Sequence, residues 1–347
     1  MKIFITGGCG FIGSNFIIDA ILSKKHTIHN LDKLTYAGNI DNLKQFEDIP
    51  EYSFTKGDIC DDKIINKIFA EFQPDVLINF AAESHVDRSI TSPIDFIKTN
   101  LLGTATLLNA STIYFKNNNK FRFLHISTDE VYGSLTDTEP TFNETNRFNP
   151  SNPYSASKAG ADHLVKSWYK TYSLPTLITN CSNNYGPYQF PEKLIPLMIS
   201  KCIDERPLPI YGKGLNIRDW LYVKDHCDAI NCVLDSGKLG ETYNLGGNNE
   251  IKNIDIVDTI CSALDKKKPR KNGLSYKELI TFVKDRPGHD YRYAIDSSKI
   301  KNNLDWKAKK SFKKGILETI DWYISNENWW RKIQNKTYNQ ERLGLLN

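Results

Sequence analysis

A tyrosine and a lysine four residues apart are well suited to taking a proton from a hydroxyl group. Tyr154 and Lys158 begin a helix-like stretch and therefore share one face of it. A phenol has an ordinary pKa near 10 and is a poor base at neutral pH, but a fixed ammonium group beside it favours the phenolate. The pair predicts removal of a proton from an alcohol. The same spacing is common by chance, so its weight depends on the rest of the sequence.

A hydroxyl and two carboxyl groups follow one another at Thr128, Asp129 and Glu130, directly after an expected strand at residues 122–127. Ligands of open parallel sheets bind beyond the carboxyl ends of the strands. Two adjacent acids can divide general-acid and general-base work if their surroundings push their pKa values apart. The alternative is an ordinary surface turn with solvated acids. The position at the end of a strand favours a catalytic role.

A glycine-rich turn near the start of the chain predicts a dinucleotide site. Residues 6–13 read TGGCGFIG and stand between an expected strand and an expected helix, with Gly7, Gly10 and Gly13 in a G-x-x-G-x-x-G spacing. Without side chains at these positions, backbone N–H groups and the positive end of the helix can approach a pyrophosphate. Glycine-rich turns occur in many loops, but the strand before and the helix after favour the dinucleotide.

An acid at the end of the second expected strand favours NAD over NADP. Asp32 lies 19 residues after Gly13, close to the spacing of the carboxylate that binds the adenosine ribose. A carboxylate there accepts hydrogen bonds from the ribose hydroxyls and repels a 2′-phosphate, although Lys33 weakens this repulsion. Asp58 is expected near the adenine, with a helix cap as its alternative role.

The elements that must position these groups alternate along the first half of the chain. Short β-type runs are expected at residues 2–6, 27–32, 52–57, 76–81, 122–127 and 176–181. Helix-length amphipathic stretches are expected at 11–23, 63–72, 94–114 and 154–172, with starts marked by Asp61, Asp62 and Ser92-Pro93. This alternation predicts the α/β class, a doubly wound parallel sheet of the Rossmann type.

After about residue 185 the chain is punctuated by Pro and Gly, with helices expected near 193–204, 223–234, 254–264 and 313–325. We expect an NAD-binding domain of residues 1–185 with about 220–250, and a smaller α/β substrate domain of about 186–219 with 251–330. Residues 331–347 are expected to form a C-terminal tail. The basic run at 266–271 is expected to be a solvated loop, with an anion site as the minor alternative.

The composition is that of a soluble globular protein. The 347 residues carry a formal charge of +4, which gives no reason to expect a nucleic-acid or membrane partner. Seven cysteines form no C-x-x-C pair, so reduced thiols and a cytoplasmic location are expected. No signal peptide, membrane span or metal-ligand pattern is expected.

Taken together, these motifs resemble the dTDP-glucose 4,6-dehydratase family of extended short-chain dehydrogenases/reductases, from residue 1 to about 325. The Thr-Asp-Glu triplet is the most discriminating element, because the related 4-epimerases lack the acid pair. Besides the glycine turn, the triplet and the Tyr/Lys pair, four segments carry the resemblance: 81–89 (AAESHVDRS), 180–188 (NCSNNYGPY), 218–223 (RDWLYV) and 285–290 (DRPGHD).

The resemblance implies two sets of binding residues. Around NAD it implies, with the three glycines, Phe11, Ile12, Asp32, Lys33, Leu34, Thr35, Asp58, Ile59, Ala81, Ala82, Ser84, Thr99, Tyr154, Lys158 and Asn184. Around a nucleotide sugar it implies Ser84, Thr128, Asn183, Lys193, Leu194, Pro209, Ile210, Tyr211, Arg218, Asn253, Asp285, Arg286 and His289. The two arginines also suit a diphosphate on chemical grounds, although ordinary ion pairs are their alternative role.

The resemblance further implies a hydro-lyase reaction on dTDP-glucose, in which Tyr154 and Lys158 support oxidation at C4. Glu130 removes the C5 proton, Asp129 protonates the leaving 6-hydroxyl, and the hydride stored on tightly bound NAD returns to C6. A homodimer formed by the helices at 94–114 and 154–172 and a place in dTDP-rhamnose biosynthesis are also implied. The alternatives are a 4,6-dehydratase or 4-epimerase acting on another nucleotide sugar, or a redox-sensing dinucleotide binder without chemistry.

Overall fold

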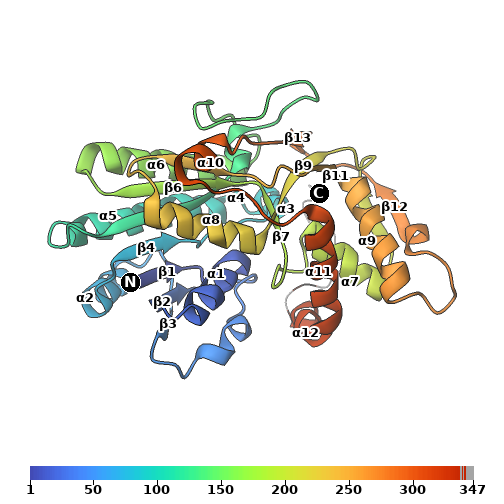
Figure 1. The fold of residues 1–347 in the computed structure, drawn as a ribbon, viewed down its shortest axis with the longest axis horizontal. Helices are drawn as coiled ribbons and strands as arrows, with labels where there is room; N and C mark the ends of the chain where they lie inside the picture. Colours follow the sequence, from blue (N-terminus) through green and yellow to red (C-terminus); the bar gives the residue numbers. More distant parts are fainter. Residues whose placement is uncertain (337, 339, 341–347) are drawn as a thin grey trace.

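Seven parallel strands form the central sheet of the larger part of the molecule (Figure 1). The computed structural model describes residues 1–336, 338 and 340. The predicted doubly wound fold is confirmed, because the strand order reverses between β1 and β4 and so opens a crevice at the carboxyl ends. The order across the sheet is β10 (Thr242–Leu245), β6 (Thr176–Cys181), β5 (Arg122–Thr128), β4 (Val76–Asn79), β1 (Lys2–Thr6), β2 (Thr27–Asp32) and β3 (Tyr52–Lys56).

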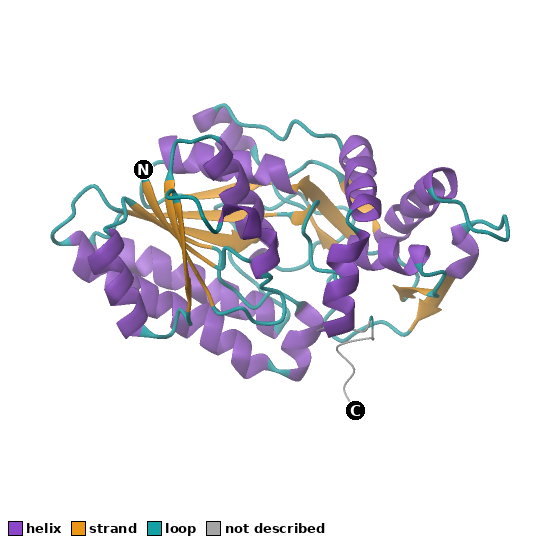
Figure 2. Cartoon of the chain, turned by 90° about the horizontal axis from the view of Figure 1, so that it is seen from below, coloured by secondary structure: helices purple, strands orange, loops and turns teal. Residues whose placement is uncertain are grey.

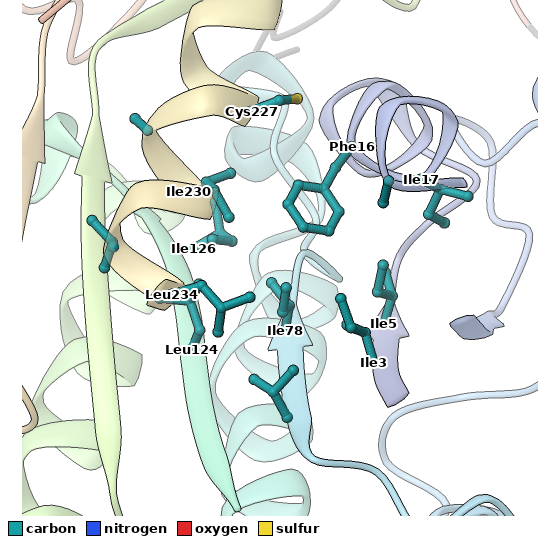
Figure 3. Close-up of a cluster of buried hydrophobic side chains, with 14 of the residues drawn as sticks. Ile3, Ile5, Phe16, Ile17, Ile78, Leu124, Ile126, Cys227, Ile230 and Leu234 are labelled. Atoms are coloured by element: carbon teal, nitrogen blue, oxygen red, sulfur yellow. The ribbon is translucent and has the colours of Figure 1, made fainter. Parts of the chain in front are cut away.

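Helices cover both faces of this sheet because successive side chains of a strand point to opposite faces. Ile3 and Ile5 of β1 pack with Phe16 of α1 and Ile230 of α8, as Figure 3 shows, whereas Phe4 packs with the helices of the other face. On the Ile3 face lie α1 (Phe11–Leu22), α8 (Val223–Ser236) and α10 (Ser298–Leu304). On the Phe4 face lie α2 (Asp62–Phe72), α5 (Thr104–Phe115) and α6 (Pro153–Tyr172).

A second hydrophobic core lies beside the sheet, in the part drawn to the right in Figure 2. Its helices are α7 (Leu194–Ile203), α9 (Asn253–Lys267), α11 (Phe312–Ser325) and α12 (Glu327–Lys336). One small sheet pairs β7 (Asn183–Tyr185), β11 (Glu250–Lys252) and β13 (Arg292–Tyr293) with β9 (Ile217–Tyr222), and another pairs β8 (Leu208–Tyr211) with β12 (Ile280–Val283). Shorter helical segments are α3 (Val86–Thr91), α4 (Pro93–Phe96), η1 (Ile40–Asn42), η2 (Lys44–Phe46), η4 (Asp129–Tyr132) and η5 (Tyr276–Leu279).

The six expected strands of the first half are present, with ends within two residues of the prediction. The expected helix at 94–114 is interrupted: α4 and α5 are joined by η3 (Ile97–Gly103), a wider π-helical segment. The Asn100 side chain bonds both the N–H and the C=O of Glu83 and the hydroxyl of Ser157. These long-range bonds supply a physical reason for the irregular backbone, which periodicity alone does not reveal.

The basic run at 266–271 is not a freely solvated loop. Helix α9 continues to Lys267, and three cations of the run form ion pairs, Lys267 with Asp321, Lys268 with Glu327 and Arg270 with Glu205. These acids belong to distant parts of the chain, so local composition did not reveal the ion pairs. The prediction of a solvated loop holds in part, because Lys266, Lys267, Pro269 and Lys271 are exposed and helix α9 ends at Lys267. Of the expected tail, residues 337, 339 and 341–347 lie outside the described residues, and the part before them belongs to α12. Within the described residues, no helix combines the length and apolar composition needed to cross a membrane.

Candidate active site

The glycine turn brings bare backbone to the start of α1. Gly7 has a φ of +72°, and a Cβ added there would lie 2.5 Å from the backbone nitrogen of Ala81. A Cβ on Gly13 would lie 2.6 Å from the carbonyl oxygen of Gly7. Glycine is therefore required at both positions by space, and at Gly7 also by conformation. The turn leaves the amino end of α1 accessible to an anion.

Asp32 is held rigidly where β2 ends. Its two carboxylate oxygens accept hydrogen bonds from the backbone nitrogens of Cys9 (2.9 Å) and Leu34 (2.8 Å). Burial raises the pKa of Asp32, and these two bonds oppose the rise. Lys33 pairs with Asp58 at 2.8 Å, and this hydrogen bond raises the pKa of the lysine. The ammonium group of Lys33 is therefore paired with Asp58 and not with Asp32.

A first cavity runs from the glycine turn to the carboxyl ends of the central strands. The residues that the resemblance implies around NAD line it, with one exception. Leu34 does not line this cavity, because its backbone takes a φ of +56° and its side chain packs against the core on the α1 face. The lining set is Gly7, Gly10, Phe11, Ile12, Gly13, Asp32, Lys33, Thr35, Asp58, Ile59, Ala81, Ala82, Ser84, Thr99, Tyr154, Lys158 and Asn184.

The Tyr/Lys pair lies at the start of α6, on the face turned to the sheet. Asn152 caps the helix through a reciprocal bond with Ser155, and this cap fixes where the helix begins. Burial, and then the charge of Glu130, raise the pKa of Tyr154 well above its ordinary value, while a hydrogen bond with Thr128 lowers it. The Nζ atom of Lys158 donates to the carbonyl oxygen of Ile126 at 2.8 Å, and burial lowers its pKa to about 8.

The adjacent acids experience different surroundings. Asp129 is 2% exposed, and burial, followed by the neighbouring charge of Glu130, raises its pKa well above the usual range. Burial also raises the pKa of Glu130, but Arg286, Arg218 and Lys193 act against that rise. The arrangement therefore favours a protonated Asp129 beside a more acidic Glu130. Thr128 and Glu130 line the first cavity, whereas Asp129 lies behind it and lines neither this cavity nor the next.

A second cavity opens between the sheet and the second core. Glu130, Asn183, Glu192 and Lys193 line both cavities and therefore mark their junction. From the set implied around a nucleotide sugar, the second cavity is also lined by Leu194, Pro209, Ile210, Tyr211, Arg218, Asn253, Arg286 and His289. Ser84 and Thr128 line the first cavity instead. Asp285 lines neither; its carboxylate bonds the Nδ1 atom of His289 and the backbone nitrogen of Arg286.

Two arginines and two lysines, Lys193 and Lys201, bring positive charge to the second cavity. The guanidinium group of Arg218 donates to the carbonyl oxygens of Ile217 (2.7 Å) and Asp290 (2.9 Å), and its carbon lies 4.3 Å from the centre of the Tyr293 ring. Arg286 pairs with Asp87 of α3. Arg218 has carbonyl partners and a ring but no carboxylate within ion-pair distance among the described residues, so its charge is available to a diphosphate.

Several residues around the two cavities were missed by motif reasoning. Glu192 accepts a bond from Arg88 at 2.9 Å, and the hydroxyl of Tyr293 lies 3.4 Å from a carboxylate oxygen of Glu130. Asp87 and His85 also line the second cavity. His85 and Asp87 stand inside the 81–89 segment, so the resemblance gave a signal for them. Glu192 could have been noticed beside Lys193, whereas Tyr293 stands on a two-residue strand that gives no periodic signal.

Comparison with known proteins agrees with this geometry. The family model described as GDP-mannose 4,6 dehydratase matches residues 4–319. A dTDP-glucose 4,6-dehydratase of Neisseria meningitidis is 51% identical over 99% of each chain. Solved structures of dTDP-glucose 4,6-dehydratases are also similar: that of Bacillus anthracis in complex with NAD is 46% identical with a TM-score of 0.86, covering 96% of this chain and 99% of the other. That of Streptomyces venezuelae with NAD and TYD bound is 39% identical with a TM-score of 0.89, covering 96% of this chain and 100% of the other. The chain belongs to the 4,6-dehydratase family that includes the dTDP-glucose 4,6-dehydratases.

Proposed function

We propose that this chain is an NAD-dependent hydro-lyase that converts dTDP-glucose into dTDP-4-keto-6-deoxyglucose and water, with the residue roles given below. The observation that carries this assignment is the junction of the two cavities, where Glu130 faces both and Tyr154 and Lys158 face the first. A hexose placed at that junction lies beside the predicted NAD site and within the reach of acid and base groups.

The binding roles follow from the chemistry of the lining residues. The backbone of the glycine turn and the amino end of α1 suit the NAD pyrophosphate, and the carboxylate of Asp32 suits the adenosine ribose. Arg218 and Arg286 suit the diphosphate of the nucleotide sugar, because guanidinium groups bind phosphate oxygens in a forked geometry. When bound, NAD supplies the acceptor and later the donor of the hydride. The residues of the chain supply the proton transfers.

Tyr154 is the proposed base for the C4 hydroxyl. Its pKa is raised by burial and by Glu130, so the phenolate needs support from positive charge. We assign that support to the ammonium group of Lys158, which lines the same cavity and is held by the carbonyl of Ile126. Thr128 stabilises the phenolate with a hydrogen bond, which acts in the same direction.

Glu130 is the proposed base for the C5 proton and Asp129 the proposed acid for the 6-hydroxyl. Three cations keep Glu130 closer to ionisation, and burial keeps the proton on Asp129. For its role the Asp129 carboxyl has to turn toward the sugar when substrate binds, since it lies behind the cavity wall. Loss of water across C5 and C6 then leaves Glu130 protonated and Asp129 ionised, ready for the return of a proton to C5.

The test is incubation of the purified protein with dTDP-glucose without added reductant, followed by detection of the 4-keto-6-deoxy product through its absorbance in alkali. Parallel incubations with uridine and guanosine diphosphate sugars test the nucleotide preference. A dTDP-4-epimer as the product would establish a 4-epimerase instead. A Tyr154→Phe variant is expected to form no NADH on mixing with substrate, and normal NADH formation in that variant would remove the tyrosine from its assigned role.

We also propose a homodimer formed through α6 and the helical run that ends in α5, which lie next to each other on one face of the sheet (Figure 1). Large apolar side chains of these elements are exposed to solvent, a feature typical of a surface covered by a partner. They are Ile94, Ile97, Leu102, Ile113, Tyr169 and Tyr172. An Ile94→Glu/Ile113→Glu variant is expected to be a monomer when its mass is measured by light scattering. Wild-type protein that is itself a monomer in the same measurement would refute the dimer.

Three broader assignments remain proposals. All seven cysteines are free, which supports a reducing, cytoplasmic location. The 4-keto-6-deoxy product suits deoxysugar synthesis, and we propose dTDP-rhamnose as its end point. Loss of rhamnose from the surface glycans of a deletion strain would test this.

We propose that residues 1–185 and about 220–250 form the first domain, and that residues of about 186–219 and 251–330 form the second. Helix α10 is the exception: it belongs with the first domain, because Ile300 packs in the core of the α1 face.

A further inference from the structure

A buried acid lies one helical turn beyond Lys158. Asp162 follows it by four residues on α6, so both side chains point at the sheet. Both are shielded from solvent. The ring of His125, on β5, touches both: its Nε2 atom lies 3.3 Å from Nζ of Lys158 and 3.6 Å from Oδ1 of Asp162. None of the binding or proton-transfer roles above uses Asp162, and it lines neither cavity.

The Asp162 carboxylate has few neutral partners. Its Oδ2 atom accepts a bond of 2.9 Å from the amide of Asn180, which also donates to the carbonyl oxygen of Thr128 at 3.0 Å. Its Oδ1 atom makes no full hydrogen bond among the described residues, although the Ser127 hydroxyl is near enough to lower the pKa of the carboxyl. Burying a carboxylate with so little solvation is costly unless a cation lies nearby. The nearby cation at this depth is the ammonium group of Lys158.

We propose that Asp162 is a positioning residue of the active site, whose carboxylate is the counter-ion that keeps the Lys158 side chain charged and in place in the cavity that Tyr154 also lines. This inference rests on the role proposed for Lys158. In the wild-type protein, burial disfavours the charged forms of Lys158 and Asp162, and the charge of each group favours the charged form of the other.

Other titratable groups around the pair do not replace Asp162. Burial lowers the pKa of His125 well below its ordinary value, so the ring on β5 stays neutral. On β6, burial raises the pKa of the Cys181 thiol, which keeps it protonated. Along α6, Lys166 carries the same sign as Lys158. Tyr154 and Glu130 line the first cavity, and burial raises the pKa of Asp129, which favours its protonated form. Asp162 is therefore the buried anion on the inner side of Lys158.

The first experiment compares the pH profile of kcat in wild-type protein and an Asp162→Asn variant. The carboxylate raises the pKa of Lys158, so its removal should move the alkaline limb toward lower pH by about one unit, which corresponds to a tenfold change in ionisation. At lower pH the rate should approach that of the wild type. An Asp225→Asn variant is the matched control, because Asp225 is another buried acid, held by the backbone nitrogens of Lys309 and Lys310 at the start of α8. An alkaline limb that stays in place in Asp162→Asn, with kcat lowered uniformly, overturns the proposal.

The second experiment measures thermal unfolding in a double-mutant cycle and needs no catalytic activity. Asp162→Asn should lower the Tm of the wild type, because it leaves a buried ammonium group without its counter-ion. In a Lys158→Met background the same change should raise the Tm, because it removes a carboxylate that has lost its cation. Equal effects in the two backgrounds overturn the proposal, as does a double variant less stable than both single variants. If wild-type protein fails to convert dTDP-glucose while this sign reversal is observed, the proposed function falls and the charge coupling between Lys158 and Asp162 stands.

Discussion

Thr128, Asp129 and Glu130 are neighbours in the chain, yet their chemistry is set by different surroundings. η4 begins right after β5, so Asp129 turns into the protein and Glu130 turns to the cavity junction. Burial and the negative charge of Glu130 raise the pKa of Asp129 and favour its protonated form. Burial also raises the pKa of Glu130, but two arginines and a lysine oppose that rise. One residue pair thereby supplies an acid and a base at the same pH.

Glu130→Gln is expected to separate the two halves of the reaction. In the proposed mechanism, oxidation at C4 depends on Tyr154 and Lys158, so NADH should form when the variant meets dTDP-glucose. Water loss should slow by at least about 100-fold, the usual contribution of a general base. Stopped-flow absorbance of NADH and quenched-flow detection of the keto product measure the two steps. Equal slowing of both would show that Glu130 acts in the first step as well.

The ionisation of Lys158 should limit activity at high pH. Burial lowers its pKa to about 8, and the ammonium form is the one that supports the Tyr154 phenolate. As pH rises through about 8, the ammonium group loses its proton and kcat should fall. A pH series of kcat in the wild-type protein measures this limb. A rate that stays constant well above this range contradicts the assigned role of the lysine.

At the scale of elements, the glycine turn shows how closely a binding site and a packing site coincide. β1 ends at Thr6, and Gly7 then lies close to the chain that follows β4. A Cβ added at Gly7 would clash with the backbone atoms of Phe80 and Ala81. The same turn begins α1, whose bare amino end faces the first cavity. A change in this turn is therefore expected to affect both sheet packing and the proposed binding of NAD.

A Gly7→Ala variant is expected to retain less bound NAD and to be less stable than the wild type. Its φ of +72° disfavours alanine by roughly 1–2 kcal/mol, and the contact of 2.5 Å with Ala81 adds a clash that backbone atoms cannot relieve. The matched control is Gly273→Ala, which has a φ of +74° but no atom within 4 Å of an added Cβ. The control variant should lose only the stability that the positive φ costs an alanine, and not the part that the clash costs. Bound NAD after purification and Tm are the two measurements, and equal losses in both variants would argue against the clash.

Sequence patterns predicted the elements whose signal is local and missed those that depend on distant partners. Strands such as β1, β2 and β6 were predicted to the residue because apolar runs end at clear breakers. The seventh strand, β10, was missed, since its four residues are too few to show a period. In the site, motif residues gather around the two cavities, but Glu192 and Tyr293 reach them only through tertiary folding. Leu34 and Asp285 belong to the right segments but point elsewhere.

At the scale of the molecule, α12 joins the second core to the loop that surrounds the glycine turn. Trp330 is buried in the second core, while the indole nitrogen of Trp329 donates to the side chain of Asn42 at 2.8 Å. The Asn42 amide in turn donates to the carbonyl oxygen of Cys9 at 3.1 Å. The helix is therefore connected by two hydrogen bonds to the turn that faces the first cavity.

Trp329→Phe is expected to speed the release of NAD. The change keeps a ring but removes the N–H donor, and one neutral hydrogen bond is worth about 0.5–1.5 kcal/mol, or roughly a two- to tenfold change in rate. Trp330→Phe is the control, because its indole nitrogen donates within the second core, to the carbonyl oxygen of Tyr323. Release is followed by exchange of the bound NAD with labelled NAD. Equal acceleration in both variants would exclude a specific path through Asn42.

The course of the chain between the two cores has a consequence for how the molecule can be taken apart. The chain leaves the large sheet after β6, returns to it with α8 and β10, departs again, and comes back once more with α10 before α11 and α12 join the second core. No single cut of the backbone separates two pieces that each carry a whole core. Limited proteolysis should therefore yield nicked molecules that stay associated, and neither half should be obtainable as an autonomous recombinant fragment.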